Sequence, residues 1–95
     1  MQQSYVYILF NQKNGTLYVG VTSNLIKRIY EHKNPTADCF TKRYGVNQLG
    51  YYEVHYSMYE AITREKQIKG GSRKKKLVLI ESANPNWNDL YHEIV

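Results

Sequence analysis

The stretch SYVYILFNQKNGTLYVGV, residues 4–21, decides the fold of this 95-residue chain. Residues 4–10 are dense in aromatic and β-branched side chains, a composition typical of a buried strand. The pair Asn14-Gly15 that follows is the strongest short signal for a hairpin turn. Residues 16–21 again favour a strand, so the stretch predicts a β-hairpin at the start of the domain.

The hairpin is followed by a predicted helix and then by a loop. Residues 22–24 are good N-cap types, so a helix is expected over 24–33. Residues 33–48 contain Pro35, Gly45 and many polar side chains, which predict a mobile loop. The apolar residues of the helix recur at helical spacing and should face the core: Leu25, Ile26, Ile29 and Tyr30.

The second half of the chain predicts one strand and two helices. Residues 49–56 have the aromatic and β-branched content of a third strand. The sequence over 57–60 has the form of a capping box, so a helix should run from there to about Lys69 and end at the following glycines. A further helix is expected over about 73–83. Asn84-Pro85 should end it, and a short tail should pack through Trp87, Leu90 and Tyr91.

These elements predict one α+β domain over residues 1–95. Its sheet should be three-stranded and mainly antiparallel, opened by the hairpin and flanked by helices.

The charge of the chain favours a polyanionic partner. Thirteen Lys and Arg residues against eight Asp and Glu give a net charge of +5, which suits nucleic acid. One basic cluster is either a solvated face or a ridge that binds the phosphate backbone, and we favour the ridge. Its members are Lys66, Lys69, Arg73, Lys74, Lys75 and Lys76.

Cysteine content and hydropathy suggest a location. Cys39 is the single cysteine, which excludes an internal disulfide and fits the reducing cytoplasm. The chain shows neither a signal peptide nor an apolar run long enough to span a bilayer, so we expect a cytoplasmic protein without membrane contact.

Six residues that carry useful chemistry are spread over the predicted elements. Tyr7 and Tyr18 lie near the middle of the hairpin strands and can share one face. Gly20 lies within a strand, where glycine often marks the close approach of a ligand or another backbone. Arg28 and His32 are four apart on one helix face, and Glu65 lies along the apolar stripe of Ala61 and Ile68. Taken singly, the tyrosines are more simply core residues, Gly20 a bulge, Arg28 and His32 a solvated face, and Glu65 the partner of Lys69 in a surface ion pair.

As an ordered set, these residues resemble the GIY-YIG nuclease superfamily. The two half-motifs appear as Tyr5-Val6-Tyr7 and Tyr18-Val19-Gly20, and the key tyrosines, Tyr7 and Tyr18, are eleven positions apart. Arg28, His32 and Glu65 follow at the family's spacing. Residues 84–90 resemble the NPxWxDL ending of the small, single-domain bacterial branch (UPF0213-like proteins). Tyr5 departs from the family pattern, because it stands where the first motif glycine belongs.

The resemblance implies a divalent-metal-dependent endonuclease with Tyr7, Tyr18, Arg28, His32 and Glu65 as catalytic residues. Tyr18 would be the general base. Since the pKa of free tyrosine is near 10, it would need a cationic neighbour or a metal to become phenolate, and His32 would relay or accept the proton. Tyr7 would orient the water or contact the phosphate, Arg28 would stabilise phosphate charge, and Glu65 would hold one Mg²⁺ or Mn²⁺. Asn84 would support substrate binding beside the metal.

The expected substrate is nucleic acid, DNA rather than RNA, with a role in repair or recombination and a protein partner that supplies specificity. Two other hypotheses stay open. One is a non-catalytic nucleic-acid-binding module, favoured by Tyr5 and the small size. The other is a protein-interaction module that uses exposed tyrosines.

Overall fold

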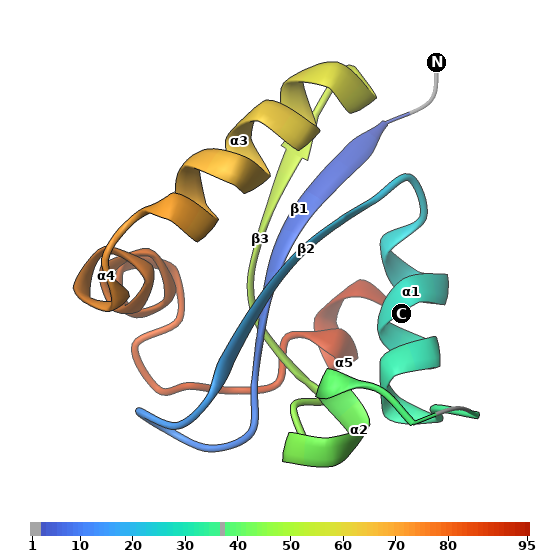
Figure 1. Cartoon of the computed structure of the whole chain (residues 1–95), viewed down its shortest axis with the longest axis vertical. Helices are drawn as coiled ribbons and strands as arrows, with labels where there is room; N and C mark the ends of the chain where they lie inside the picture. Colours follow the sequence, from blue (N-terminus) through green and yellow to red (C-terminus); the bar gives the residue numbers. More distant parts are fainter. Residues whose placement is uncertain (1–2, 37) are drawn as a thin grey trace.

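The computed structural model describes residues 3–36 and 38–95, and it places one sheet between two groups of helices (Figure 1). The predicted α+β class is therefore confirmed. In chain order the elements are β1 (Ser4–Phe10), β2 (Leu17–Thr22), α1 (Leu25–Lys33), α2 (Phe40–Tyr44), β3 (Gln48–His55), α3 (Met58–Gly70), α4 (Arg73–Ala83) and α5 (Tyr91–Ile94).

The sheet has the strand order β2-β1-β3, and both pairings are antiparallel. The predicted opening hairpin is thus present. In its turn the Gly15 amide donates to the carbonyl oxygen of Gln12 at 2.8 Å, and Asn14 has a φ of 59°. Because β1 is the central strand, it is covered on both faces, which explains why residues 4–10 are almost continuously apolar.

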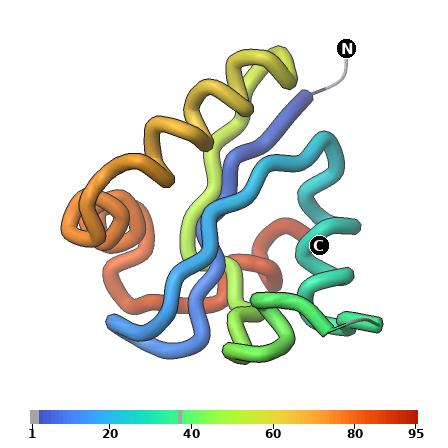
Figure 2. Tube along the Cα trace, in the orientation of Figure 1, coloured from blue at the N-terminus to red at the C-terminus, as the bar shows by residue number. Residues whose placement is uncertain are grey.

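Each sheet face has its own group of helices, on opposite sides of the strands in Figure 2. One face carries Val6 and Ile8 and packs against α3, α4 and Trp87. The other carries Tyr7 and Leu9 and packs against α1 and the C-terminal segment. Alternation along β1 therefore sends Tyr7 to the α1 side of the sheet.

The predicted caps of two helices are confirmed. The side chain of Asn24 accepts from the backbone amide of Lys27 at 3.1 Å, and Ser57 accepts from that of Glu60 at 3.1 Å. These local bonds satisfy amides that have no partner inside the helix.

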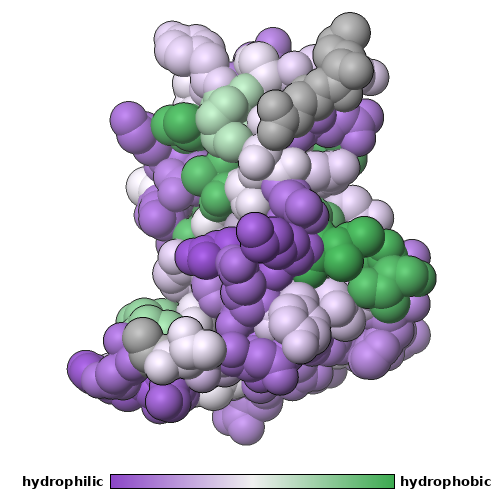
Figure 3. All heavy atoms as spheres, turned by 90° about the vertical axis from the view of Figure 1, so that its right-hand side faces the viewer, coloured by the Kyte–Doolittle hydropathy of each residue, from purple (hydrophilic) through white to green (hydrophobic). Residues whose placement is uncertain are grey.

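The buried face of α1 differs from the sequence-based expectation. Leu25 and Ile29 are buried as predicted, but Ile26 and Tyr30 are 46% and 57% exposed, so their predicted core positions are wrong. The residues that face the sheet are Leu25, Ile29 and His32, and a position one residue further on is turned about 100° away. Figure 3 views this side of the molecule and shows hydrophobic atoms in separate groups among hydrophilic ones.

The segment predicted as a loop contains the short helix α2. Its Thr41 side chain is buried, and the carbonyl oxygen of Thr41 accepts from the Val46 amide at 2.9 Å. Gly45 ends the helix with a φ of 63°, a conformation that glycine adopts without strain. A single buried side chain within a polar stretch gives little periodic signal, so α2 was missed.

The C-terminal tail packs on the sheet as predicted. Trp87 is buried against the α3–α4 side, while Leu90 and Tyr91 pack on the α1 side. The Asp89 carboxylate accepts from the Leu49 amide at 2.9 Å, and the Leu90 amide donates to the Leu49 carbonyl oxygen at 2.8 Å. Among the described residues, no helix is both long and apolar enough to cross a membrane.

Candidate active site

Tyr7 and Gly20 lie directly opposite each other in the hairpin. Tyr7 is 1% exposed, and a Cβ atom on Gly20 would lie 2.4 Å from both its hydroxyl oxygen and its Cζ atom. Only glycine leaves room for this phenol. The expectation that Gly20 makes room for a ligand is therefore corrected: the group that approaches it closely is the Tyr7 side chain.

Tyr18 shares the sheet face of Tyr7, as the hairpin predicted. The two ring centroids are 6.5 Å apart. Unlike Tyr7, the Tyr18 side chain is only partly buried, and it lines a surface groove. The ammonium group of Lys69 lies 5.9 Å from the centre of its ring. Tyr18 is thus the tyrosine of the pair that solvent can reach.

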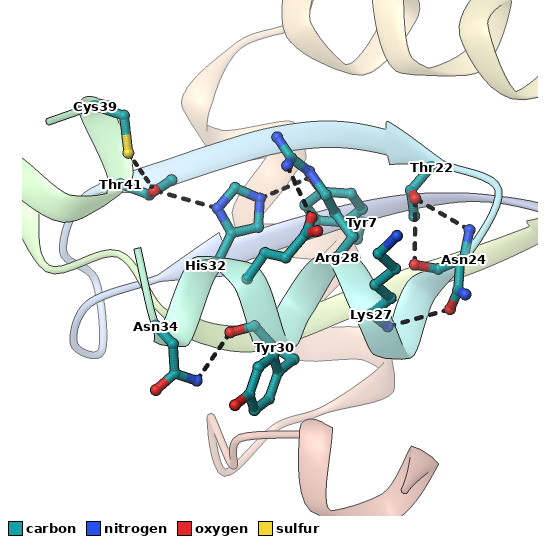
Figure 4. A network of polar contacts seen from close by, with 11 residues as sticks. Tyr7, Thr22, Asn24, Lys27, Arg28, Tyr30, His32, Asn34, Cys39 and Thr41 are labelled. Carbon is teal, nitrogen blue, oxygen red and sulfur yellow. Dashed lines mark hydrogen bonds and ion pairs between the residues drawn. The ribbon is translucent and has the colours of Figure 1, made fainter. Parts of the chain in front are cut away.

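His32 is a buried residue of α1 that lies between Tyr7 and Thr41 of α2 (Figure 4). Its Nε2 atom is 3.0 Å from the Tyr7 hydroxyl, and its Nδ1 atom is 3.2 Å from the hydroxyl of Thr41. The imidazole ring also packs edge-on against Tyr18, with centroids 5.6 Å apart. The hydrogen bond expected to serve Tyr18 is therefore made to Tyr7.

Arg28 lies one helical turn before His32, and its guanidinium group is near the Tyr7 hydroxyl. It forms an ion pair with Glu31 at 3.2 Å, and both side chains are nearly half exposed. An exposed ion pair of this kind contributes little to stability. The guanidinium group is consequently free to exchange Glu31 for an anionic ligand at low energetic cost.

Burial sets the protonation states of Tyr7 and His32. It raises the pKa of Tyr7 to about 12, although the adjacent Arg28 opposes the shift. Burial, followed by the positive charge of Arg28, lowers the pKa of His32 to about 4. At neutral pH, Tyr7 is therefore protonated and His32 is neutral. Tyr7 can donate to Nε2 of His32, whose Nδ1–H then donates to Thr41.

Glu65 comes from α3, on the far side of the sheet, and approaches the same place. Its side chain is 13% exposed and forms an ion pair with Lys69 at 3.0 Å. The surface ion pair expected between these two residues is therefore present. The ammonium group of Lys69 in turn lies 5.9 Å from the centre of the Tyr18 ring, so Glu65 is connected to the tyrosine pair through Lys69.

The basic cluster faces two depressions. Lys69 and Arg73 line the groove beside Tyr18, Lys74 and Lys75 line a depression between α3 and α4, and Lys76 lines both. Arg73 donates to the carbonyl oxygens of Asn14 and Gly15, which ties α4 to the hairpin turn. Lys66 is exposed on α3. Part of the predicted ridge is thus turned away from the tyrosines.

Asn84 is buried, and its amide is fully used by the backbone. Its Nδ2 atom donates to the carbonyl oxygens of Gly50 and Asn88, at 3.2 and 2.8 Å, and its Oδ1 atom accepts from the Asn88 amide at 3.0 Å. It also ends α4. These bonds give Asn84 a structural role, and its place at the substrate site stays a prediction.

A profile of the GIY-YIG catalytic domain matches residues 3–77. The chain belongs to the GIY-YIG family. It is 43% identical to a UPF0213 protein of Clostridium perfringens over 91 residues, 96% of this chain and 97% of that protein. It is 41% identical to a UPF0213 protein of Staphylococcus saprophyticus over 80 residues, 84% of this chain and 96% of that protein.

A solved structure supports the same assignment. The UPF0213 protein of Bacillus halodurans, determined by solution NMR, is 30% identical, has a TM-score of 0.56 and covers 92% of each chain. The resemblance to the small bacterial branch is therefore confirmed. GIY-YIG domains belong to a nuclease superfamily that generally uses a divalent metal, and membership implies interaction with nucleic acid.

The residues of this GIY-YIG domain fit a metal that needs few protein ligands. In the described part of the chain, no group of three or more His, Cys, Asp and Glu side chains could enclose a cation. Mg²⁺ keeps several of its waters and is commonly bound by one or two carboxylates together with substrate phosphates. Glu65 offers one such carboxylate, partly shielded from solvent and at present paired with Lys69.

The site is intact although Tyr5 stands in place of the first glycine of the family motif. Tyr5 pairs with Thr22 and Val54 and is partly buried on the α1 side of the sheet. Its hydroxyl donates to the side chain of Gln3 at 3.0 Å, away from the bonds of Tyr7. The side chain that the family lacks here is therefore accommodated without displacing Tyr7.

Thr41 and Phe40 are site residues that the sequence did not reveal. Thr41 hydrogen-bonds His32, and the Phe40 ring lies 5.9 Å from that of Tyr18. Both come from the segment predicted as a loop. The available signal was the aromatic pair Phe40 and Tyr44, four residues apart and followed directly by Gly45, which is the pattern of one helical turn and its cap.

Proposed function

We propose that this GIY-YIG domain is a divalent-metal-dependent endonuclease that hydrolyses phosphodiester bonds in DNA. The observation that carries the proposal is the convergence of five side chains from four separate elements: Tyr7, Tyr18, Arg28, His32 and Glu65. Each type is suited to a part of phosphodiester hydrolysis, which requires an activated water and stabilised charge on phosphoryl oxygens. We place its action on damaged or branched DNA, in repair or recombination, with a partner protein supplying specificity.

Arg28 and Tyr7 would bind the scissile phosphate. The exposed guanidinium group of Arg28 can make two parallel hydrogen bonds to phosphate oxygens once it leaves Glu31. Tyr7 stays protonated because burial raises its pKa to about 12. In the other tautomer of neutral His32, Nε2–H donates to the Tyr7 oxygen and Nδ1 accepts from the Thr41 hydroxyl, so the Tyr7 O–H would be left to donate to a phosphate oxygen.

Tyr18 would act as the general base. Of the two tyrosines it is the one partly open to solvent, at the groove where substrate would enter. As the phenolate, its oxygen would accept the proton of the attacking water as the water oxygen bonds to phosphorus and the bond from phosphorus to the leaving oxygen breaks. A cation held by Glu65 would supply stabilisation of the negative charge on that leaving oxygen.

Cleavage assays on a panel of DNA and RNA substrates, with Mg²⁺ or Mn²⁺, test the proposal. We expect Glu65→Gln and Arg28→Ala to reduce kcat about 100- to 1000-fold, the loss typical of removing one charge-stabilising group. Glu60→Gln is the matched control, because Glu60 is an exposed glutamate on the same helix, and it should cleave like the wild type. If the wild type and Glu65→Gln leave every substrate equally intact, an enzymatic function is refuted.

A non-catalytic nucleic-acid-binding module is the second candidate. The ion pair of Glu65 with Lys69 favours it, because the carboxylate already has a positively charged partner. This candidate predicts salt-sensitive binding that Arg28→Ala and Glu65→Ala leave unchanged, with no turnover. Binding and cleavage measured on the same variants therefore separate the two functions.

A further inference from the structure

A row of aromatic rings leads from the buried Tyr7 to the protein surface. Tyr7 is 6.5 Å from Tyr18, Tyr18 is 5.9 Å from Phe40, and Phe40 is 4.7 Å from Tyr44, measured between ring centroids. Exposure rises along the row: Tyr7 is buried, Tyr18 is partly buried, and Phe40 and Tyr44 are 45% and 50% exposed. The last two rings therefore present apolar area to solvent beside the proposed general base.

The two exposed rings stand on an anchored helix. Phe40 and Tyr44 are four residues apart on α2, so they share one face of it. The buried Thr41 of the same helix is bonded to His32. At the other end, the Asn11 side chain donates to the carbonyl oxygen of Tyr44 at 3.2 Å. Phe40 and Tyr44 are thus positioned by bonds to the active site and to the end of β1.

The groove beside Tyr18 and Phe40 is lined by positively charged side chains. Tyr18 and Phe40 line a groove of about 880 Å³, together with Lys69, Arg73 and Lys76. Among the described residues that line it, none is Asp or Glu. Aromatic rings beside a basic groove are the usual features of a surface that binds unpaired nucleotides, because the rings stack on bases while the cations contact phosphates.

We propose that Phe40 and Tyr44 form a stacking subsite for an unpaired nucleobase, beside the nucleotide whose phosphate Tyr7 and Arg28 would bind. A base within a duplex is already stacked between its neighbours and cannot offer a free face to a side chain. The preferred substrate is therefore single-stranded nucleic acid, or a single-stranded segment of a longer molecule. This inference rests on the proposed function, whose phosphate-binding residues set the position of the base.

Binding of oligonucleotides that carry 2-aminopurine, whose fluorescence is quenched by stacking, tests the subsite. The full chain is used in EDTA, so that no cleavage occurs. We expect Phe40→Ala and Tyr44→Ala to weaken binding of the single strand about 5- to 150-fold, the loss typical of one stacked base. They should also restore the fluorescence, whereas duplex binding should change less than about twofold.

Matched variants separate stacking from folding. Tyr59→Ala removes a tyrosine that is 80% exposed on α3, and it should bind like the wild type. Phe40→Tyr and Tyr44→Phe keep an aromatic ring, so both should retain binding and quenching. The slope of affinity against salt concentration should stay unchanged in Phe40→Ala, because no phosphate contact is lost.

Several results would overturn the subsite. One is that Phe40→Ala and Tyr44→Ala bind and quench like the wild type. Another is that Phe40→Tyr loses as much binding as Phe40→Ala. The third is that the wild-type protein binds duplex more tightly than single strand. Failure of the stacking subsite can be told apart from failure of the nuclease function. Cleavage that is unaffected by both alanine variants refutes the subsite alone, whereas ring-dependent quenching without turnover in Mg²⁺ or Mn²⁺ refutes the nuclease alone.

Discussion

At the scale of single residues, the fit between Gly20 and Tyr7 is the contact that shapes the site. The motif pairs a glycine on one strand with a tyrosine directly across from it on the other. The phenol of Tyr7 occupies the volume that a side chain on Gly20 would need. The glycine is therefore required for packing between strands, and its effect on catalysis acts through the position of Tyr7.

We expect Gly20→Ala to lower the free energy of unfolding by about 1–3 kcal/mol, the cost typical of overpacking a core. Urea denaturation measures this value, and cleavage assays should show a parallel loss of kcat as Tyr7 is displaced. Gly70→Ala is the control, because nothing lies within 4 Å of a Cβ atom there. It should be neutral or stabilising by up to about 1 kcal/mol. A Gly20→Ala protein with wild-type stability and activity would contradict the packing role.

Protonation of His32 makes stability depend on pH. Its pKa is lowered to about 4 in the folded protein, against about 6.5 in an unfolded chain. As pH falls, the unfolded chain binds this proton first, so the stabilisation is complete above about pH 6.5 and is lost as pH falls towards 4. We expect His32 to account for a loss of about 2 kcal/mol between pH 7 and pH 5.

Urea denaturation of wild type and His32→Asn at pH 7 and pH 5 checks the contribution of His32. The variant should be less stable at pH 7 and should lose less stability on acidification than the wild type. His92→Asn, at an exposed histidine of α5, should keep the wild-type pH dependence. Equal slopes in wild type and His32→Asn would show that the imidazole is not held neutral by burial.

At the scale of elements, α3 and α4 turn different parts of the basic cluster towards different surfaces. Lys69 and Lys76 line the groove beside Tyr18, while Lys74 and Lys75 line only the other depression, which Lys76 also reaches. The two pairs carry the same charge but differ in position and in one ion pair, that of Lys69 with Glu65. Long-range attraction of a polyanion would respond equally to either pair, whereas direct phosphate contact would not.

We expect Lys69→Ala/Lys76→Ala to weaken binding of single-stranded DNA at least tenfold more than Lys74→Ala/Lys75→Ala. Only the first pair should reduce the slope of log affinity against log salt, by about 1.4 for two lost phosphate contacts. Fluorescence anisotropy at several salt concentrations provides the measurement. Equal effects of the two double variants would support a continuous ridge along α4.

At the scale of the whole molecule, the C-terminal tail joins the two faces of the sheet. Trp87 packs on the α3–α4 side, and Leu90 packs on the α1 side. Asn84 lies at the start of this crossing, with its amide bonded to Gly50 on β3 and to the tail itself. The segment resembling the ending of the bacterial branch therefore packs on both faces of the sheet and is bonded to β3.

We expect Asn84→Ala to reduce the free energy of unfolding by about 1–3 kcal/mol, because buried backbone groups lose their partner. The cleavage rate per folded molecule should equal that of the wild type. Asn86→Ala, at an exposed position of the same turn, should change neither quantity. A stable Asn84→Ala protein with a greatly reduced kcat would return Asn84 to the substrate site.

Local signals were sufficient for most of the fold. The composition of residues 4–10, the Asn14-Gly15 turn and the caps at Asn24 and Ser57 depend on near neighbours in the chain, and each prediction was confirmed. The short helix α2 carries only a weak local signal, the turn of Phe40 and Tyr44 before Gly45, and its bond from Thr41 to His32 joins segments that are separate in the sequence. The sequence also did not show that Ile26 and Tyr30 remain exposed.

By itself, the sequence determined which chemical groups the domain carries and in which elements they lie, since spacing along a strand or helix fixes the face on which a side chain stands. Only the tertiary structure decided how those groups meet. It placed His32 within hydrogen-bonding distance of Tyr7, filled the space beside Gly20 with the Tyr7 ring, buried Asn84, and directed Lys69 and Lys74 towards different depressions. The physical reason is that burial, hydrogen bonding and charge depend on distances through space, which are set only when all the elements have packed.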